Sequence, residues 1–210
     1  MLSILIVDDH AIVRRGIREI TEEIPGETVV DEAENGRQAL KNMDLKNYGL
    51  ILMDIAMPGE NGLEILRQIK KMNRRQKVII LSMYSDESYV YRAMKAGADG
   101  YVTKDNTPDE LVEAILTVMD GKSYISSSLK DEMDGALEDR SEEKVHARLT
   151  NREFQVMLLI ASGSSVSEIA DKLCISVKTV STHRAAILDK MKMRNNSELT
   201  HYVIKEELIR

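Results

Sequence analysis

The sequence predicts two folded parts, a doubly wound α/β domain with a five-stranded parallel sheet and a small all-α domain of four helices. Short apolar runs alternate with helix-spaced segments five times within the first 120 residues, which is typical of alternating strands and helices. Every pattern after residue 146 is helical. The segment between them, residues 121–146, is rich in Ser and then in acids, and it is longer than most loops inside a compact domain. We therefore expect a first domain over residues 1–120, a linker over 121–146 and a second domain over 147–210.

Continuous apolar runs predict the strands of the first domain. Parallel strands that helices cover on both faces lack polar alternation, and runs such as "ILIV" and "VIIL" fit that expectation. The five predicted strands are Ser3–Val7, Thr28–Ala33, Leu50–Met53, Val78–Ser82 and Gly100–Val102.

Apolar residues at helical spacing separate these runs and predict the helices that cover the sheet. Connections of this kind between parallel strands are the usual way to build a doubly wound fold. Clear examples are the sets Ile12, Ile17 and Ile20, then Leu63, Leu66 and Ile69, and then Leu111, Ile115 and Met119.

Four helices are predicted in the second domain. Thr150 followed by Glu153 is a capping box, and Phe154, Met157, Leu158 and Ala161 form one apolar face of the helix that Gly163 ends. The remaining three helices are expected over Val166–Leu173, Val177–Lys192 and about Ser197–Leu208.

Composition and charge limit the class of protein. The net charge of -6 is uneven: residues 1–120 carry 15 basic and 21 acidic side chains, whereas residues 172–194 carry six basic residues and one acid. The longest apolar run has about six residues, far fewer than the ~20 of a membrane helix, so no membrane partner is expected. The single cysteine, Cys174, can form no internal disulfide, which favours a cytoplasmic location, and its helical context favours a place in the core.

Polar side chains gather where the predicted strands end. Ligands of open parallel sheets bind at the carboxyl ends of the strands, where the sequence has Asp8, Asp9, Asp54, Ser82 and Lys104. Three converging carboxylates repel one another, by roughly 4 kcal/mol for each close pair, and so require a cation. Hard oxygen ligands with room for waters and a phosphate suit Mg²⁺. The pattern therefore indicates phosphoryl transfer to a carboxylate, although an acid pair alone would more often be a solvated turn.

The helix predicted over Val177–Lys192 has one apolar and one polar face. Val180, Ile187 and Met191 fall on the inner face. The outer face is small and polar near its start, so it could approach the major groove of DNA as the second helix of a helix-turn-helix. A solvated amphipathic helix is the alternative interpretation. The outer residues are Lys178, Ser181, Thr182, Ala185, Asp189 and Lys192.

The motifs "ILIVDDH", "LILMDIAMPGENG", "VIILS" and "AGADGYVTK" resemble the flavodoxin-like receiver domain of two-component response regulators. The resemblance covers residues 1 to about 120. It implies that a sensor histidine kinase phosphorylates Asp54, and that Ser82 and Lys104 bind the phosphoryl oxygens. It also implies that Tyr101 acts with Ser82 as the aromatic switch. The implied Mg²⁺ ligands are Asp8, Asp9, Asp54 and the backbone carbonyl of Ala56.

Residues 147–208 resemble the LuxR-type effector of the NarL/FixJ subfamily. The hallmarks are Leu149-Thr150, Arg152-Glu153, Glu168-Ile169-Ala170, Lys178-Thr179-Val180 and His183. The resemblance implies that Lys178, Ser181, Thr182 and Ala185 face the groove, with Thr179 and Lys192 as phosphate contacts. We interpret His183 as a helix-packing residue rather than a base reader.

Together these features predict a DNA-binding transcriptional response regulator that accepts a phosphoryl group but is not otherwise an enzyme. The expected partners are a sensor histidine kinase, double-stranded promoter DNA and a second copy of the chain, with RNA polymerase as a further candidate. Leu199, Val203 and Ile204 in the last helix are interpreted as a dimer surface. One alternative is a regulator whose receiver is a phosphorylation-independent interaction module. Another, a haloacid-dehalogenase-type phosphohydrolase, is disfavoured because Asp8 and Asp9 are adjacent and point in opposite directions.

Overall fold

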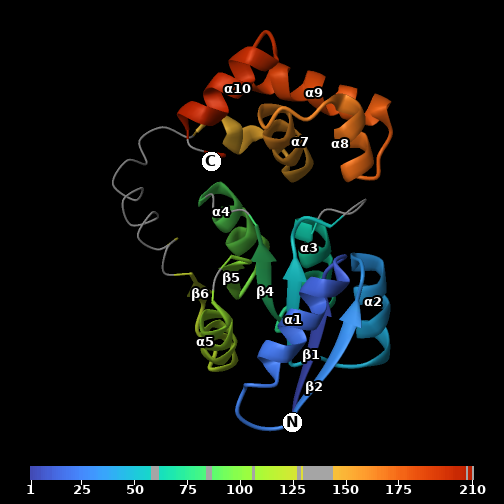
Figure 1. Ribbon diagram of the computed structural model, residues 1–210, viewed down its shortest axis with the longest axis vertical. Coiled ribbons are helices and arrows are strands. Elements are labelled where there is room, and N and C mark those ends of the chain that lie inside the picture. Colours follow the sequence, from blue (N-terminus) through green and yellow to red (C-terminus); the bar gives the residue numbers. More distant parts are fainter. Residues whose placement is uncertain are drawn as a thin grey trace. The chain divides into compact units, whose positions relative to one another are not determined.

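The computed structural model describes residues 1–57, 62–83, 87–105, 107–126, 129, 144–206 and 208–209 of the chain. The chain divides into two compact units, Met1–Asp134 and Gly135–Arg210. Figure 1 shows the first unit as a sheet between helices and the second as a group of helices. No helix in the described part is long and apolar enough to cross a membrane.

A parallel sheet forms the centre of the first unit. Its strand order is β2-β1-β3-β4-β5-β6, and every neighbouring pair is parallel. Because the chain adds β2 on one side of β1 and β3 on the other, the winding reverses between β1 and β3. Such a reversal is where doubly wound sheets bind their ligands. The strands are β1 (Leu2–Val7), β2 (Thr28–Ala33), β3 (Leu50–Asp54), β4 (Lys77–Ser82), β5 (Gly100–Thr103) and β6 (Tyr124–Ile125).

Helices cover both faces of this sheet, as predicted for a doubly wound fold (Figure 1). α1 contacts α5, while α3 contacts both α2 and α4, so the helices form one layer on each face. The central strands are buried throughout; all five residues of β3 are buried, including Asp54 at its end. The helices are α1 (Ala11–Thr21), α2 (Gly36–Leu45), α3 (Gly62–Met72), α4 (Glu87–Ala96) and α5 (Pro108–Met119).

The number of strands differs from the prediction, which was five. β6 lies within the segment that was assigned to the linker, and it pairs with Gly100 and Tyr101 of β5. Beyond it, the Ser126 N–H donates to the Tyr101 carbonyl over 3.2 Å, and Leu129 is fully buried. A strand of two residues has no periodicity to detect, so its place is set by the neighbouring strand rather than by its own pattern.

The second unit contains four α-helices after a short 3₁₀ helix, η1 (Val145–Arg148). Capping boxes fix two of the helix starts, at Thr150 with Glu153 and at Ser165 with Glu168. Gly163, with a φ of +84°, lies just beyond the first of these helices, as expected for a glycine that ends a helix. The four helices are α7 (Asn151–Ala161), α8 (Val166–Lys172), α9 (Val177–Met191) and α10 (Asn196–Lys205).

Two expectations about the second unit are wrong. Cys174 is exposed, because α8 ends at Lys172 and the thiol lies in the turn that follows, with a φ of 47°. Leu199 and Val203 are fully buried in their own unit, so they cannot form a dimer surface without unfolding. Ile204, at 59% exposure, is the one member of that predicted surface that lies outside.

Candidate functional site

The carboxyl ends of the parallel strands bring the predicted polar residues into one pocket. Asp8 and Asp9 follow β1, and Asp54 ends β3, the strand beside it. Ser82 ends β4 and Lys104 follows β5. The Lys104 N–H donates to the Ser82 carbonyl over 2.8 Å, which ties these two strand ends together.

Lys104 bridges the two buried carboxylates of the pocket. Its Nζ lies 2.6 Å from Asp8 Oδ2 and 2.6 Å from Asp54 Oδ2. The side chains of Asp8 and Asp54 are 1% and 3% exposed. Because a single ammonium faces two carboxylates here, the pocket keeps an excess of negative charge.

The pKa values of this pair reflect that excess. Burial raises the pKa of Asp54 above its usual range, and Lys104 and the Ala56 N–H only limit the rise. Burial would lower the pKa of Lys104, but Asp54 and then Asp8 outweigh it, so the Lys104 pKa is raised. The ammonium is therefore held in its charged form, while Asp54 would be stabilised by a further cation.

The backbone around Asp54 fixes its carboxylate in place. Asp54 Oδ1 accepts a hydrogen bond from the Ala56 N–H over 2.9 Å. Gly62, at the start of α3, packs so closely that an added Cβ would lie 2.6 Å from Ile55 Cα and 2.8 Å from the Asp54 carbonyl oxygen. Only a glycine fits at this position without displacing the strand end that carries Asp54.

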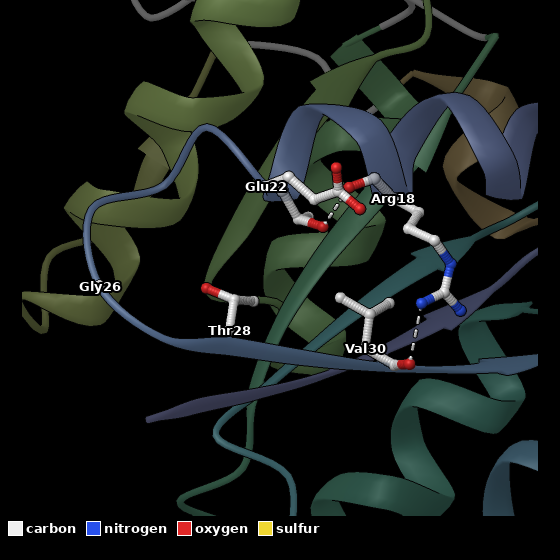
Figure 2. A pocket seen from close by; sticks show the side chains of 6 residues that line it. Arg18, Glu22, Gly26, Thr28 and Val30 are labelled. Carbon is white, nitrogen blue, oxygen red and sulfur yellow. Dashed lines mark hydrogen bonds between the residues drawn. The ribbon is translucent and has the colours of Figure 1, made fainter.

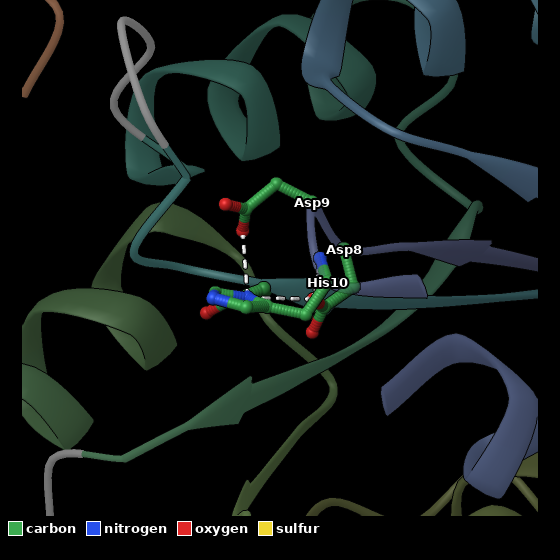
Figure 3. Close-up of side chains that lie close together, drawn as sticks. Asp8, Asp9 and His10 are labelled. Carbon is green, nitrogen blue, oxygen red and sulfur yellow. Dashed lines mark hydrogen bonds and ion pairs between the residues drawn. The ribbon is translucent and has the colours of Figure 1, made fainter. Parts of the chain in front are cut away.

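Asp9 and His10 complete an acidic cluster at the mouth of the pocket. One ligand atom from each of Asp8, Asp9, His10 and Asp54 lies within 4.8 Å of the others. His10 Nδ1 lies 3.1 Å from Asp9 Oδ1 and 3.3 Å from Asp8 Oδ1, and Figure 3 shows the imidazole against both carboxylates. The sequence prediction did not include His10, although its place directly after two acids at a strand end was a usable signal.

Arg14 is a second member of this region that the prediction missed. Its guanidinium is buried in α1 and donates to the Asp8 carbonyl over 2.8 Å. Glu32 and Glu34, at the end of β2, bind the same guanidinium over 2.9 and 3.3 Å. Arg18 and then Arg14 lower the pKa of Glu32, so this network is ionised and holds the end of β1 in place.

Ser82 and Tyr101 are both fully buried, and Tyr101 is among the largest buried side chains of the protein. Tyr101 sits in β5, opposite Ile80 of β4. In this structure its ring therefore occupies the interior position that the switch hypothesis assigns to the activated form.

A separate hollow of about 240 Å³ lies between the end of α1 and β2 (Figure 2). Its main charged group, Arg18, already donates to the Val30 carbonyl and to Glu32. The strand-end pocket therefore has the stronger set of chemical groups. The residues that line the hollow are Arg18, Thr21, Glu22, Gly26, Thr28 and Val30.

In the second unit, α9 has the two faces that the sequence predicted. Val180, Ile187 and Met191 are buried. Near the helix start, Ser181 and Thr182 direct their hydroxyls to helix carbonyls one turn back, over 3.0 Å each. Thr179 is half-buried and its hydroxyl lies 2.8 Å from that of the N-cap Ser176. The outer residues Lys178, Ser181, Thr182, Ala185, Asp189 and Lys192 are all exposed.

Buried contacts hold α9 against α7. Lys190 donates to Glu153 over 2.6 Å, and Lys190 and the Thr150 cap lower the pKa of Glu153 despite its burial. His183 is half-buried; burial and then Arg152 lower its pKa. This position supports the interpretation of His183 as a packing residue.

Comparisons with known proteins give consistent matches for both units. Residues 4–116 match the response regulator receiver domain, and residues 147–203 match the bacterial regulatory proteins of the luxR family. The response regulator UvrY of Escherichia coli (strain K12) is 39% identical over 209 residues, which are 99% of this chain and 96% of UvrY. The response regulator GacA of Pseudomonas protegens is 36% identical over 210 residues, which are 100% of this chain and 98% of GacA.

Solved structures agree with these matches. RcsB from Salmonella enterica serovar Typhimurium, bound to promoter rprA in the presence of the phosphomimetic BeF3-, has a TM-score of 0.67 at 26% identity. That likeness covers 97% of this chain and 99% of the RcsB chain. A LuxR-family two-component response regulator from Aurantimonas sp. SI85-9A1 has a TM-score of 0.62 at 35% identity, over 67% of this chain and 98% of that one.

Proposed function

The chain belongs to the NarL/FixJ family of two-component response regulators, and from this membership we propose that a sensor histidine kinase phosphorylates it on Asp54. It is a DNA-binding regulator of the LuxR type. We keep the division into a receiver over 1–120, a linker over 121–146 and a helix-turn-helix domain over 147–210 as part of this proposal.

The observation that carries the proposal is the arrangement of Asp54 with Asp8 and Lys104. Asp54 is nearly fully buried, yet its Oδ2 shares one ammonium with Asp8 and its Oδ1 is held by a backbone N–H. A carboxylate held in this way is a positioned nucleophile for a phosphoryl group. In the transfer, a carboxylate oxygen of Asp54 forms a bond to phosphorus as the bond to the kinase histidine nitrogen breaks.

The other residues of the pocket have roles that follow from their positions. We assign Lys104 to the phosphoryl oxygens, which requires it to exchange its contact with Asp54 for one with the new group. Ser82, at the end of the neighbouring strand, supplies a hydroxyl for another phosphoryl oxygen, and Tyr101 responds to the displacement of Ser82.

The residues at the pocket fit a divalent cation. Asp9 Oδ1 is a buried carboxylate oxygen without a hydrogen bond to any described residue, and Asp8 and Asp54 share an excess of negative charge. The residues that would hold Mg²⁺ are Asp8, Asp9, Asp54 and the Ala56 carbonyl. A bound Mg²⁺ would neutralise charge on the carboxylates and on the incoming phosphoryl oxygens.

We assign promoter DNA to the exposed face of α9. Lys178, Ser181, Thr182 and Ala185 would face the major groove, and Thr179 and Lys192 would contact phosphates. RcsB has been solved as two dimers bound to two parallel DNAs, and a homodimer on paired half-sites is proposed for this chain by analogy. Binding to promoter DNA puts its site of action in the cytoplasm, with RNA polymerase as a further candidate partner.

Regulation by Asp54 is tested by DNA affinity with and without phosphorylation. Duplexes would first be selected from a random pool with wild-type protein treated with Mg²⁺ and acetyl phosphate. We expect this treatment to raise the affinity of the wild type for a selected duplex, with a coupling of about 5- to 150-fold. Asp54→Asn should bind the same duplex with or without the donor at the unphosphorylated level, as measured by fluorescence anisotropy. A donor effect of equal size in Asp54→Asn would contradict the proposal.

Lys178→Ala tests the groove face of α9. Removing one phosphate-neutralising charge should weaken DNA binding and reduce the slope of log affinity against log salt concentration by about 1. Lys205→Ala removes the same charge from an exposed position in α10 and is the matched control, for which no change of slope is expected. Equal slopes for the two variants would argue against α9 as the DNA-contacting helix.

A further inference from the structure

His10 is placed by the backbone rather than by a role in capping its helix. It is the N-cap residue of α1, but its side chain makes no capping hydrogen bond. Its N–H donates to Asp8 Oδ1 over 2.7 Å, which fixes the residue beside that carboxylate. The imidazole is 65% exposed, so it lies at the pocket rim with one side open to solvent.

The carboxylate oxygens nearest to His10 are not those that Lys104 contacts. Lys104 faces Oδ2 of Asp8 and of Asp54, whereas His10 Nδ1 lies close to Oδ1 of Asp8 and of Asp9. Asp9 Oδ1 is buried and makes no hydrogen bond to any residue that the structure describes; His10 Nδ1 is at ion-pair distance from it without hydrogen-bond geometry. An oxygen in this condition is stabilised by a cation placed between it and the nitrogen.

We infer that His10 is a nitrogen ligand of the acidic pocket and makes it selective for a borderline divalent cation, Zn²⁺, over what three carboxylates alone would bind. The four ligand atoms lie within 4.8 Å of one another, as a shared ion requires. This inference rests on the proposed function only in that the same pocket holds the cation.

The chemistry of the donor set supports this choice. Mg²⁺ prefers oxygen ligands and retains water, so an imidazole adds little to its binding. Zn²⁺ accepts imidazole nitrogen together with carboxylate oxygen, in sites of four ligands. Carboxylates alone already bind Zn²⁺ more tightly than Mg²⁺, so the contribution of His10 is visible in how its removal changes each affinity.

The test is calorimetric titration of the full chain with Zn²⁺ and, separately, with Mg²⁺. All variants carry Cys174→Ser, because the exposed thiol would otherwise bind Zn²⁺. His10→Asn should weaken Zn²⁺ binding by at least about tenfold, the lower end of the loss for a removed supporting residue, and leave Mg²⁺ binding unchanged. His201→Asn, which removes an exposed histidine of α10, is the matched control and should change neither affinity.

A direct readout accompanies the titration. Imidazole nitrogen resonances in ¹⁵N spectra should shift for His10 on addition of Zn²⁺ and stay in place on addition of Mg²⁺. The inference is overturned if His10→Asn changes both affinities equally or changes neither, or if the His10 resonance does not respond to Zn²⁺. Phosphorylation of Asp54 with Mg²⁺ in wild type and His10→Asn is measured separately; its absence in the wild type would reject the proposed function without bearing on His10.

Discussion

Lys104→Met is expected to destabilise the first unit by about 3–5 kcal/mol in the absence of divalent cations, the usual loss when one partner of a buried ion pair is removed. Asp8 and Asp54 are almost fully buried, and both make their 2.6 Å ion pair with this one ammonium. Met fills a similar volume, so the change removes the charge without leaving a cavity. Urea unfolding measures the loss.

Mg²⁺ should restore much of this lost stability, because a cation bound to the carboxylates takes over the role of the ammonium. Lys70→Met is the matched control. Lys70 lies 2.7 Å from Asp99 and donates to the Gln76 carbonyl, away from the strand-end pocket, so its loss of stability should not respond to Mg²⁺. If Mg²⁺ stabilises Lys104→Met no more than the wild type, the pocket does not bind the ion through Asp8 and Asp54.

Phe154→Ala is expected to unfold the second unit. Phe154 is fully buried in α7, and its ring centroid lies 5.5 Å from that of the buried His146. Loss of such a side chain costs about 3–5 kcal/mol, which is comparable to the roughly 3–9 kcal/mol available to a domain of about 60 residues. We expect the helical signal of residues 147–210 to melt at a lower temperature and DNA binding to be lost, as followed by circular dichroism and anisotropy.

The receiver should be unaffected by this substitution, since it forms a separate compact unit. Phosphorylation of Asp54 in Phe154→Ala should therefore remain at the wild-type level. Ile204→Ala, at an exposed position in the same unit, should retain the wild-type melting temperature. Wild-type DNA affinity in Phe154→Ala would show that the packing of α7 against its neighbours is not needed for the fold of α9.

The sequence predicted the parallel sheet well because its strands are continuously apolar. The runs at Thr28–Ala33 and Val78–Ser82 match β2 and, to within one residue, β4. β6 was missed because Tyr124 and Ile125 have no pattern of their own, and their strand exists only through pairing with β5. Non-local pairing of this kind is invisible to local periodicity.

The site was predictable to the extent that it depends on strand ends. Asp8, Asp54 and Lys104 converge because β1, β3, β4 and β5 are neighbours in the sheet. The ion pair of Lys104 with both carboxylates, and the approach of His10 to Asp9, depend on side-chain positions that sequence spacing does not specify.

In the second unit, helical periodicity identified the inner face of α9 but not the details at helix ends. Val180 and Ile187 are buried as predicted. Cys174 was assigned to the core because α8 was extended to Leu173, whereas the helix ends one residue earlier. Leu199 and Val203 were assigned to a dimer surface because an apolar face does not reveal whether it packs within the domain or against a second copy.

The most direct test of the phosphoacceptor proposal is the intact mass of the protein after incubation with Mg²⁺ and acetyl phosphate. The proposal predicts a gain of one phosphoryl group in the wild type and in Asp109→Asn, which replaces an exposed acid at the start of α5. The gain should be absent in Asp54→Asn and in wild type incubated with a chelator. An adduct of the same mass in Asp54→Asn, or none in the wild type, would contradict the assignment of Asp54 as the phosphoacceptor.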